Sequence, residues 1–154
     1  MLTLAVGYQL KLQQEIIENG QRKKIGLWLK EKASSPNDSV YLECLGYIGY
    51  YSRLKMLDFP GLSSPEVVEA RRMLQTDDYA PLIRLLHPDW LVLRPVEISK
   101  INEQLPNFLT AYYEQVTTFD VTEKLDSHPY LPGRPLLEFE RVFKIFRIKK
   151  TKPA

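Results

Sequence analysis

Two short apolar segments, "VYLEC" (40–44) and "WLVLR" (90–94), constrain the fold of this chain most. Nearly uninterrupted apolar runs of this length are typical of strands that are buried on both faces, as in a parallel sheet covered by helices. Segments with helical patterns lie between them, at 64–75 and 78–89. Because parallel strands need crossover connections, this alternation predicts an α/β domain.

The remaining segments complete a predicted sheet. "LKMLD" (54–58) is a further short strand, whereas "AYYEQVTTFDV" (111–121) and "LLEFERVFKIFRI" (136–148) alternate apolar and polar residues, as antiparallel strands with one solvated face do. "DSHPYLPGRP" (126–135) is predicted to be a surface loop between the last two strands. We therefore predict a three-layer α/β domain with a mixed sheet, parallel in its first half and ending in an antiparallel C-terminal strand pair.

A long N-terminal amphipathic helix is predicted over residues 1–33, ahead of the α/β core at 34–150 and a tail at 151–154. Apolar residues recur in this region at three-to-four spacing, namely Ile16, Ile17, Ile25, Trp28 and Leu29. The pair Asn19-Gly20 marks a point where the helix is expected to kink or split. All 154 residues are predicted to form a single domain.

The charge balance argues against a nucleic-acid partner. The 21 basic and 19 acidic residues give a formal net charge of +2 and are spread along the chain, so no strong field favours nucleic acid. The apolar start "MLTLAVGYQL" is shorter than the roughly 20 residues that cross a bilayer. It runs directly into the amphipathic helix, a pattern that also fits a chain segment following a membrane span.

The usual signatures of metal, cofactor or covalent chemistry are missing from the sequence. His87 and His128 are not spaced as zinc ligands, and neither a phosphate-binding Walker loop nor a Gly-x-Ser-x-Gly elbow occurs. The single cysteine, Cys44, lies in an apolar run and is expected to be a buried, unreactive thiol. We therefore predict no metal, no cofactor and no catalytic residue.

Four residues form a candidate ligand edge. Glu43 and Asp58 lie at the carboxyl ends of two predicted strands, where open α/β sheets bind ligands, and Tyr47 and Tyr50 follow the first of these strands. In the alternative interpretation each carboxylate pairs with an arginine, Arg53 or Arg94, or caps a backbone group.

Glycines and a turn surround this candidate edge. Gly46 and Gly49 are expected to pack closely against the sheet. In "DFPGLSSPEV", Gly61 helps to reverse the chain and Ser63 or Ser64 is expected to cap a helix with Pro65 in its first turn. Glu66 is expected to complete a capping box with Ser63, and Asp58 to lie beside the start of that helix.

The segment "YLECLGYIGYYSRLKMLDFPGLSSPEVVEARR" followed by "LIRLLHPDWLVLRP" resembles the C-terminal soluble region of bacterial polytopic glycosyltransferases of the dolichyl-phosphate-mannose mannosyltransferase-like (GT-C) class. The resemblance covers most of residues 25–148 and departs at Cys44, where a proline or small residue is expected. The matching signature positions are Glu43, Gly46, Tyr47, Gly49, Tyr50, Ser52, Asp58, Gly61, Ser64, Pro65 and Glu66.

This resemblance implies a non-catalytic accessory domain on the extracytoplasmic (periplasmic) side of the cell membrane. Such enzymes take sugar from a polyprenyl-phosphate donor with acidic residues of a loop between early membrane helices, so no catalytic role carries over to this chain. The implied partners are the membrane-embedded portion of a parent protein and a sugar or acceptor. The alternative is a free-standing soluble α/β domain that binds a small ligand or a protein partner at the edge between Glu43 and Asp58.

Overall fold

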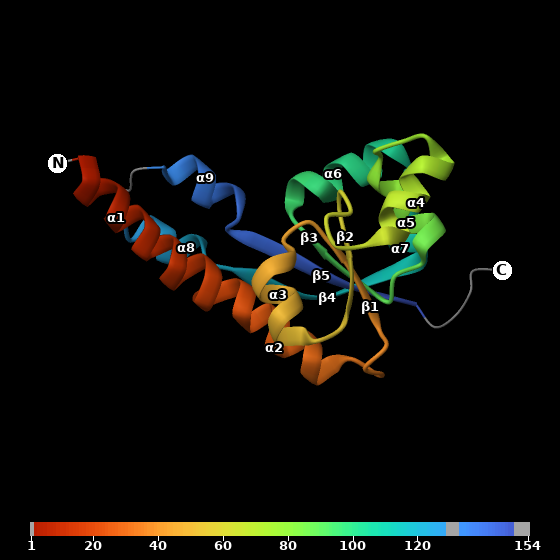
Figure 1. Cartoon of the computed structure of the whole chain (residues 1–154), viewed down its shortest axis with the longest axis horizontal. Coiled ribbons are helices and arrows are strands. Elements are labelled where there is room, and N and C mark those ends of the chain that lie inside the picture. Colours follow the sequence, from red (N-terminus) through yellow and green to blue (C-terminus); the bar gives the residue numbers. More distant parts are fainter. Residues whose placement is uncertain (1, 129–132, 150–154) are drawn as a thin grey trace.

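One five-stranded sheet with helices on both faces forms the centre of the computed structural model, which describes residues 2–128 and 133–149 (Figure 1). The strands are β1 (Ser39–Leu42), β2 (Lys55–Asp58), β3 (Trp90–Leu93), β4 (Tyr113–Asp120) and β5 (Val142–Ile148), in the order β2-β1-β3-β5-β4. β1 pairs in parallel with β2 and β3, whereas β5 is antiparallel to β3 and β4. The predicted mixed sheet is confirmed.

Helices account for most of the remaining chain. They are α1 (Leu2–Leu12), the π-helix η1 (Gln13–Arg22), α2 (Lys23–Lys32), α3 (Leu45–Ser52), α4 (Pro65–Leu74), α5 (Tyr79–Leu86), α6 (Pro95–Gln104), α7 (Phe108–Tyr112), α8 (Thr122–Asp126) and α9 (Arg134–Phe139). α2 and α3 cover one face of the sheet, and α4 to α7 cover the other (Figure 1).

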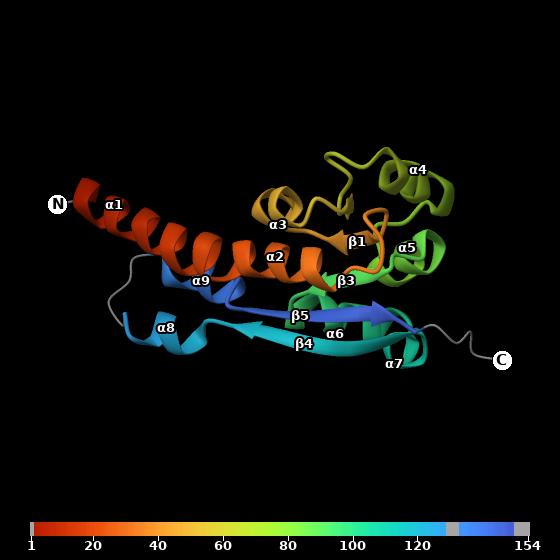
Figure 2. The same ribbon diagram turned by 90° about the horizontal axis from the view of Figure 1, so that it is seen from below.

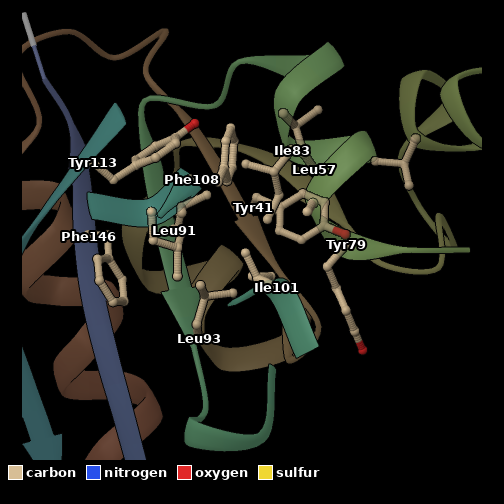
Figure 3. Packing of buried hydrophobic residues seen from close by; sticks show 13 residues of the cluster. Tyr41, Leu57, Tyr79, Ile83, Leu91, Leu93, Ile101, Phe108, Tyr113 and Phe146 are labelled. Carbon is tan, nitrogen blue, oxygen red and sulfur yellow. The ribbon is translucent and has the colours of Figure 1, made fainter. Parts of the chain in front are cut away.

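The two faces of the sheet have separate hydrophobic cores, because successive strand residues point to opposite sides. Tyr41, Leu91 and Leu93 face α5 and α6, where they meet Ile83 and Ile101 (Figure 3). On the other face, the core residues are Val40, Leu42, Trp90, Val92, Phe143 and Ile145 from the sheet and Ile25, Leu29 and Ile48 from α2 and α3. β3 is buried along its whole length, as its apolar sequence predicts.

The predicted N-terminal helix runs through α1, η1 and α2 from Leu2 to Lys32, and Asn19-Gly20 widens it into a π-helix and does not split it. The Lys23 N–H donates to the Glu18 carbonyl, five residues earlier. A Cβ at Gly20 would lie 2.8 Å from the Glu15 carbonyl oxygen, so this wide turn favours glycine.

The predicted strand over 136–148 is wrong in its first half. Residues Arg134–Phe139 form α9, and β5 begins only at Val142. Pro135 suits the first turn of a helix, and Leu137 packs in a third apolar cluster with Ile16 and Ile17. Likewise, α7 extends to Tyr112, so the strand predicted from 111 starts at Tyr113.

The predicted loop at 126–135 lies partly outside the described residues, since 129–132 are not described; its flanks belong to α8 and α9. β4 ends where β5 begins, with Asp120 opposite Val142. α8 and α9 therefore lie beyond the carboxyl edge of the parallel strands, at the same end of the molecule as α1 (Figure 2). Gln21 joins this end to the sheet by donating hydrogen bonds to the Phe119 and Arg141 carbonyls, at 3.2 and 2.7 Å.

Candidate functional site at the carboxyl edge of the sheet

The carboxyl ends of β1 and β3 form a topological switch point. From β1 the chain passes through α3 to β2 on one side, then returns through α4 and α5 to β3 on the other side of β1. Ligands of open α/β sheets bind in the crevice outside such a point. Here Glu43 and Cys44 follow β1, and Arg94 follows β3.

Six charged residues fill this crevice, and we call them the switch-point cluster: Glu18, Arg22, Glu43, Arg94, Glu97 and Glu140. Arg94 is at its centre and is only 3% exposed. Its guanidinium contacts Glu43, lies 2.7 Å from Glu97 and 2.6 Å from Glu140, and stacks 4.3 Å from the centre of the Phe139 ring. Glu97 also accepts a 2.5 Å hydrogen bond from the Arg94 backbone N–H.

Arg22 joins the cluster from η1. Its guanidinium lies 2.7 Å from Glu18 and 2.9 Å from Glu140, so Glu140 bridges the two arginines. Burial by itself would raise the pKa of Glu140, but Arg22 and Arg94 outweigh burial and hold that pKa below its usual range. Glu140 is therefore ionised at neutral pH.

Cys44 borders the cluster without being activated by it. Its sulfur lies 3.2 Å from Glu140 and 3.5 Å from an Arg22 nitrogen. Burial and the neighbouring Glu140 carboxylate raise the pKa of the thiol far above its ordinary value. Because the thiolate is the reactive form, this cysteine is not a nucleophile at neutral pH.

The crevice is thus occupied by the chain's own side chains. Both guanidiniums are engaged by carboxylates, from η1, the loop after β1, α6 and the turn before β5. Four carboxylates against two guanidiniums leave two negative charges in excess. The cluster ties four parts of the fold together and provides no unengaged guanidinium for an anionic ligand.

An open aromatic surface lies next to the cluster. Gly46, Tyr47, Tyr50 and Tyr51 line a cavity of about 400 Å³, which we call the tyrosine surface. The Tyr51 ring centre is 5.9 Å from that of Tyr47 and 5.0 Å from that of Tyr50, and Tyr50 is 75% exposed. Rings presented in this way offer large, rigid contact area to a partner.

A second cavity, the polar groove, shares Gly46 and Tyr47 with the tyrosine surface and has a volume of about 360 Å³. Its other lining residues are Leu10, Gln13, Gln14, Glu18 and Arg22. The Gln14 amide donates a 2.5 Å hydrogen bond to the Tyr47 hydroxyl, which connects η1 to α3. The groove therefore joins amide, carboxylate and phenol groups beside the aromatic rings.

The four predicted ligand-edge residues make three different sets of contacts. Tyr47 and Tyr50 share the tyrosine surface, whereas Glu43 belongs to the switch-point cluster and pairs with Arg94, as the alternative interpretation predicted. Asp58 is the last residue of β2, opposite Leu42 and therefore beside Glu43 at the sheet edge, and it is 1% exposed. The carboxylates of Glu43 and Asp58 are engaged by other groups of the chain, and the tyrosines line a separate cavity.

Asp58 organises the loop before α4. Its carboxylate accepts hydrogen bonds from the Leu62 and Ser63 N–H groups at 2.7 and 3.1 Å, and from the Ser63 and Ser64 hydroxyls at 2.6 and 2.5 Å. Burial opposes ionisation, but these hydrogen bonds outweigh it and lower the pKa of Asp58. Gly61 has a φ of +99°, which explains the glycine at this position.

The capping box predicted for α4 is wrong. Ser64 does precede the helix, but its hydroxyl donates to the Asp58 carboxylate and accepts from the Asp58 N–H, and it makes no bond to the helix. Glu66 reaches across to Lys55 at 2.7 Å. Pro65 takes the first helical position as expected.

Only one of the two glycines of α3 packs against the sheet. A Cβ at Gly49 would lie 3.1 Å from Met56 of β2, whereas a Cβ at Gly46 would meet nothing within 4 Å. The predicted packing role of Gly46 is therefore wrong, because Gly46 faces solvent at the tyrosine surface.

Sequence reasoning missed most of the switch-point cluster. Arg94 had a usable signal, since it directly follows an apolar strand at the carboxyl edge. Glu140 had none, because it lies 46 residues from Arg94 and 118 from Arg22 along the chain.

The fold and site define a small α/β domain whose switch point is closed by its own charged side chains. The chain belongs to the family described as Domain of unknown function (DUF8728), whose sequence model matches residues 9–139. No curated protein and no solved structure matches the chain.

Within 2–128 and 133–149, no group of three or more His, Cys, Asp or Glu side chains could hold a metal ion. Among the helices described, none combines the length and apolar character needed to cross a membrane.

Proposed function

We propose that this chain is a non-catalytic binding domain that works at a membrane surface, as an accessory domain of a glycosyltransferase using polyprenyl-phosphate-linked sugar. The proposal rests on the difference between the switch-point cluster and the two cavities beside it at the carboxyl edge of the sheet. The charged groups of the switch-point cluster are engaged with one another, while the tyrosine surface and the polar groove beside them stay open. An open aromatic and polar surface can contact a partner. Acid–base or nucleophilic catalysis instead needs an ionisable or nucleophilic side chain that is not already engaged by its neighbours.

The exposed apolar residues of α1 support the membrane part of the proposal. Leu4 is 79% and Leu10 58% exposed, Val6 and Tyr8 are also exposed, and Lys11 is the first charged residue. These side chains lie on both flanks of the helix, so α1 is apolar over most of its circumference, a pattern typical of helices surrounded by apolar material. We infer that this end contacts the bilayer on the extracytoplasmic side.

The same end of the molecule carries the proposed ligand surface. Leu10 of α1 lines the polar groove together with Tyr47, so a ligand held near the bilayer would reach both the tyrosine rings and the amide groups of η1. Aromatic faces and planar polar side chains suit a hydroxyl-rich sugar ring, on the donor or on its acceptor. The membrane-embedded portion of the parent protein is the proposed partner.

Vesicle flotation tests the proposal. The full chain is mixed with vesicles that contain or lack polyprenyl-phosphate mannose, and the bound fraction is measured. Leu4→Asp with Leu10→Asp is expected to abolish flotation. Tyr47→Ala with Tyr50→Ala is expected to keep flotation on plain vesicles and lose the additional binding that the lipid-linked sugar provides.

Two outcomes would contradict parts of the proposal separately. Transfer or release of the sugar by the isolated chain would contradict the non-catalytic role. Equal flotation of all three proteins would contradict the membrane and sugar contacts, and would favour the alternative of a free-standing domain with a small ligand or a protein partner.

A further inference from the structure

α5, α7 and the end of β5 lie at the end of the molecule opposite α1 (Figure 2), and residues of these elements line a third cavity. It has a volume of about 260 Å³ and is formed where α5 ends, α7 passes into β4, and β5 ends. We call it the basic aromatic pocket, and its lining residues are Arg84, His87, Phe108, Tyr112, Tyr113 and Ile148. None of them belongs to the switch-point cluster or to the tyrosine surface.

Backbone hydrogen bonds fix the rim of the pocket. The His87 N–H donates to the Ile83 carbonyl at 3.0 Å, and His87 adopts a left-handed conformation with φ +47° that ends α5. On the opposite side, the Lys149 N–H donates to the Tyr112 carbonyl at 2.9 Å. Hydrogen bonds at the end of α5, and between the end of α7 and the residue after β5, therefore hold the rim in place.

The interior of the pocket is aromatic. The Phe108 ring centre lies 5.2 Å from that of Tyr112 and 6.0 Å from that of Tyr113, and Figure 3 shows Phe108 and Tyr113 side by side. The Tyr113 hydroxyl already donates to the Pro88 carbonyl at 3.1 Å. Phe108 and Tyr113 belong to the buried core and are only 4% and 3% exposed, whereas Tyr112 is 36% exposed, so Tyr112 is the ring that a ligand would meet.

The rim is basic. Arg84 and His87 are exposed, and neither forms an ion pair with another of the described residues. The nearby Asp89 is engaged by Ser39, whose N–H and hydroxyl lie 2.7 and 2.8 Å from its carboxylate. Lys149 adds a further positive charge next to Ile148, with its ammonium donating to the Thr110 carbonyl.

We propose that the basic aromatic pocket binds a small planar organic anion, a single ring that carries a carboxylate or a phosphate group. The cavity is smaller than the roughly 300 to 1,000 Å³ of sites for drug-sized ligands, which suits one ring. The guanidinium of Arg84 can bind two oxygens of such a group at once, while the ring stacks on the exposed Tyr112.

Arg84 and His87 also complement the negative end of the α5 dipole. That role alone predicts a change of melting temperature in variants without any ligand dependence. Binding therefore has to be measured directly, on the complete chain.

Titrations followed by NMR, with benzoate, phenyl phosphate, benzyl alcohol and inorganic phosphate as probes, test the proposal. We expect benzoate or phenyl phosphate to shift signals of Tyr112 and Ile148 saturably, with a dissociation constant in the ~1 mM range or tighter. Benzyl alcohol lacks the charge and inorganic phosphate lacks the ring, so each should bind about ten-fold more weakly or not at all. A response to benzoate alone or to phenyl phosphate alone identifies the preferred anion.

Two variants and a control complete the experiment. Arg84→Gln should weaken binding about ten-fold, because a charged hydrogen-bond partner is lost. His87→Asn tolerates the left-handed backbone and removes the imidazole, so it should weaken binding with little change of melting temperature. Arg141→Gln, an exposed arginine at the opposite end of β5, should bind as the wild type does. Absence of saturable binding to both anions, or binding that is unchanged in Arg84→Gln, would overturn the proposal.

Discussion

At the scale of single residues, the carboxylates of the buried Asp58 and Glu97 and the half-buried Glu140 are held in two different ways. Asp58 is satisfied by hydroxyl and backbone N–H donors of its own loop, whereas Glu97 and Glu140 are satisfied by the guanidinium of Arg94. A carboxylate with neutral donors stabilises a local turn, and one with a buried arginine links distant elements. The consequences of removing a partner therefore differ.

Replacing Asp58 by Asn removes the charged acceptor of the loop before α4. Because the pKa of Asp58 is lower in the folded chain than in the unfolded chain, its contribution is present above about pH 4 and lost as the pH falls below that value. Asp58→Asn should lower the free energy of unfolding by about 1 to 3 kcal/mol at pH 7, and by less at pH 3. Urea denaturation at both pH values measures this; the exposed Asp77→Asn is the control, and equal losses at pH 3 and 7 would contradict the account.

Replacing Arg94 by Ala leaves Glu97 and Glu140 without their shared cation. Removing one member of a buried ion pair typically lowers the free energy of unfolding by about 3 to 5 kcal/mol, and we expect a loss of this size. Thermal denaturation provides the measurement. Arg72→Ala, which breaks the exposed pair with Glu69, should leave the melting temperature nearly unchanged. If both variants melt alike, the switch-point cluster does not stabilise the fold.

At the scale of the elements, strands were predicted well where the sequence contains a short, mostly apolar run. β1, β2 and β3 lie within the predicted segments or extend them by one residue; β1 and β3 are mostly apolar on both faces, whereas the edge strand β2 is exposed at Lys55. α9 was missed because six residues of alternating character fit a helical turn as well as a strand. The switch-point cluster was missed because its members come from four separate segments, and no local pattern reports contacts across 46 or 118 residues.

The contact between α2 and α3 also could not be predicted from the sequence. Gly46 and Gly49 were the glycines expected to pack closely, yet the close approach of α2 to α3 is at Gly26, where a Cβ would lie 2.9 Å from both the Ile48 carbonyl oxygen and the Tyr51 Cβ. An isolated glycine in a helical pattern gives no indication of the element it faces. The role of Gly26 is evident only from the structure, in which α3 packs against it.

A matched pair of glycine substitutions tests this contact. Gly26→Ala should lower the free energy of unfolding by roughly 1 to 3 kcal/mol, since the helices must separate to admit the methyl group. Gly46→Ala adds the same methyl group where nothing lies within 4 Å, so it should be neutral or stabilise α3 by up to about 1 kcal/mol. Chemical denaturation of both variants gives the comparison. Equal destabilisation by the two changes would contradict the assigned packing.

At the scale of the whole molecule, the two ends of the sheet differ in chemistry. The carboxyl edge carries the apolar α1, the tyrosine surface and an excess of carboxylates, whereas the opposite end carries the basic aromatic pocket (Figure 2). An end that is apolar and aromatic is suited to a bilayer and to a ligand held at its surface. The central claim is that α1 and the tyrosine surface work together at one membrane-facing end.

Hydrogen exchange with vesicles tests that claim most directly. The complete chain is incubated in deuterated buffer with and without vesicles containing polyprenyl-phosphate mannose, and peptide masses are followed over time. Protection is predicted to increase together in α1 and α3, and to stay unchanged in α5 and α7 at the opposite end. Increased protection confined to α5 and α7, or no change in α1 at a vesicle concentration that binds the chain, would contradict the account.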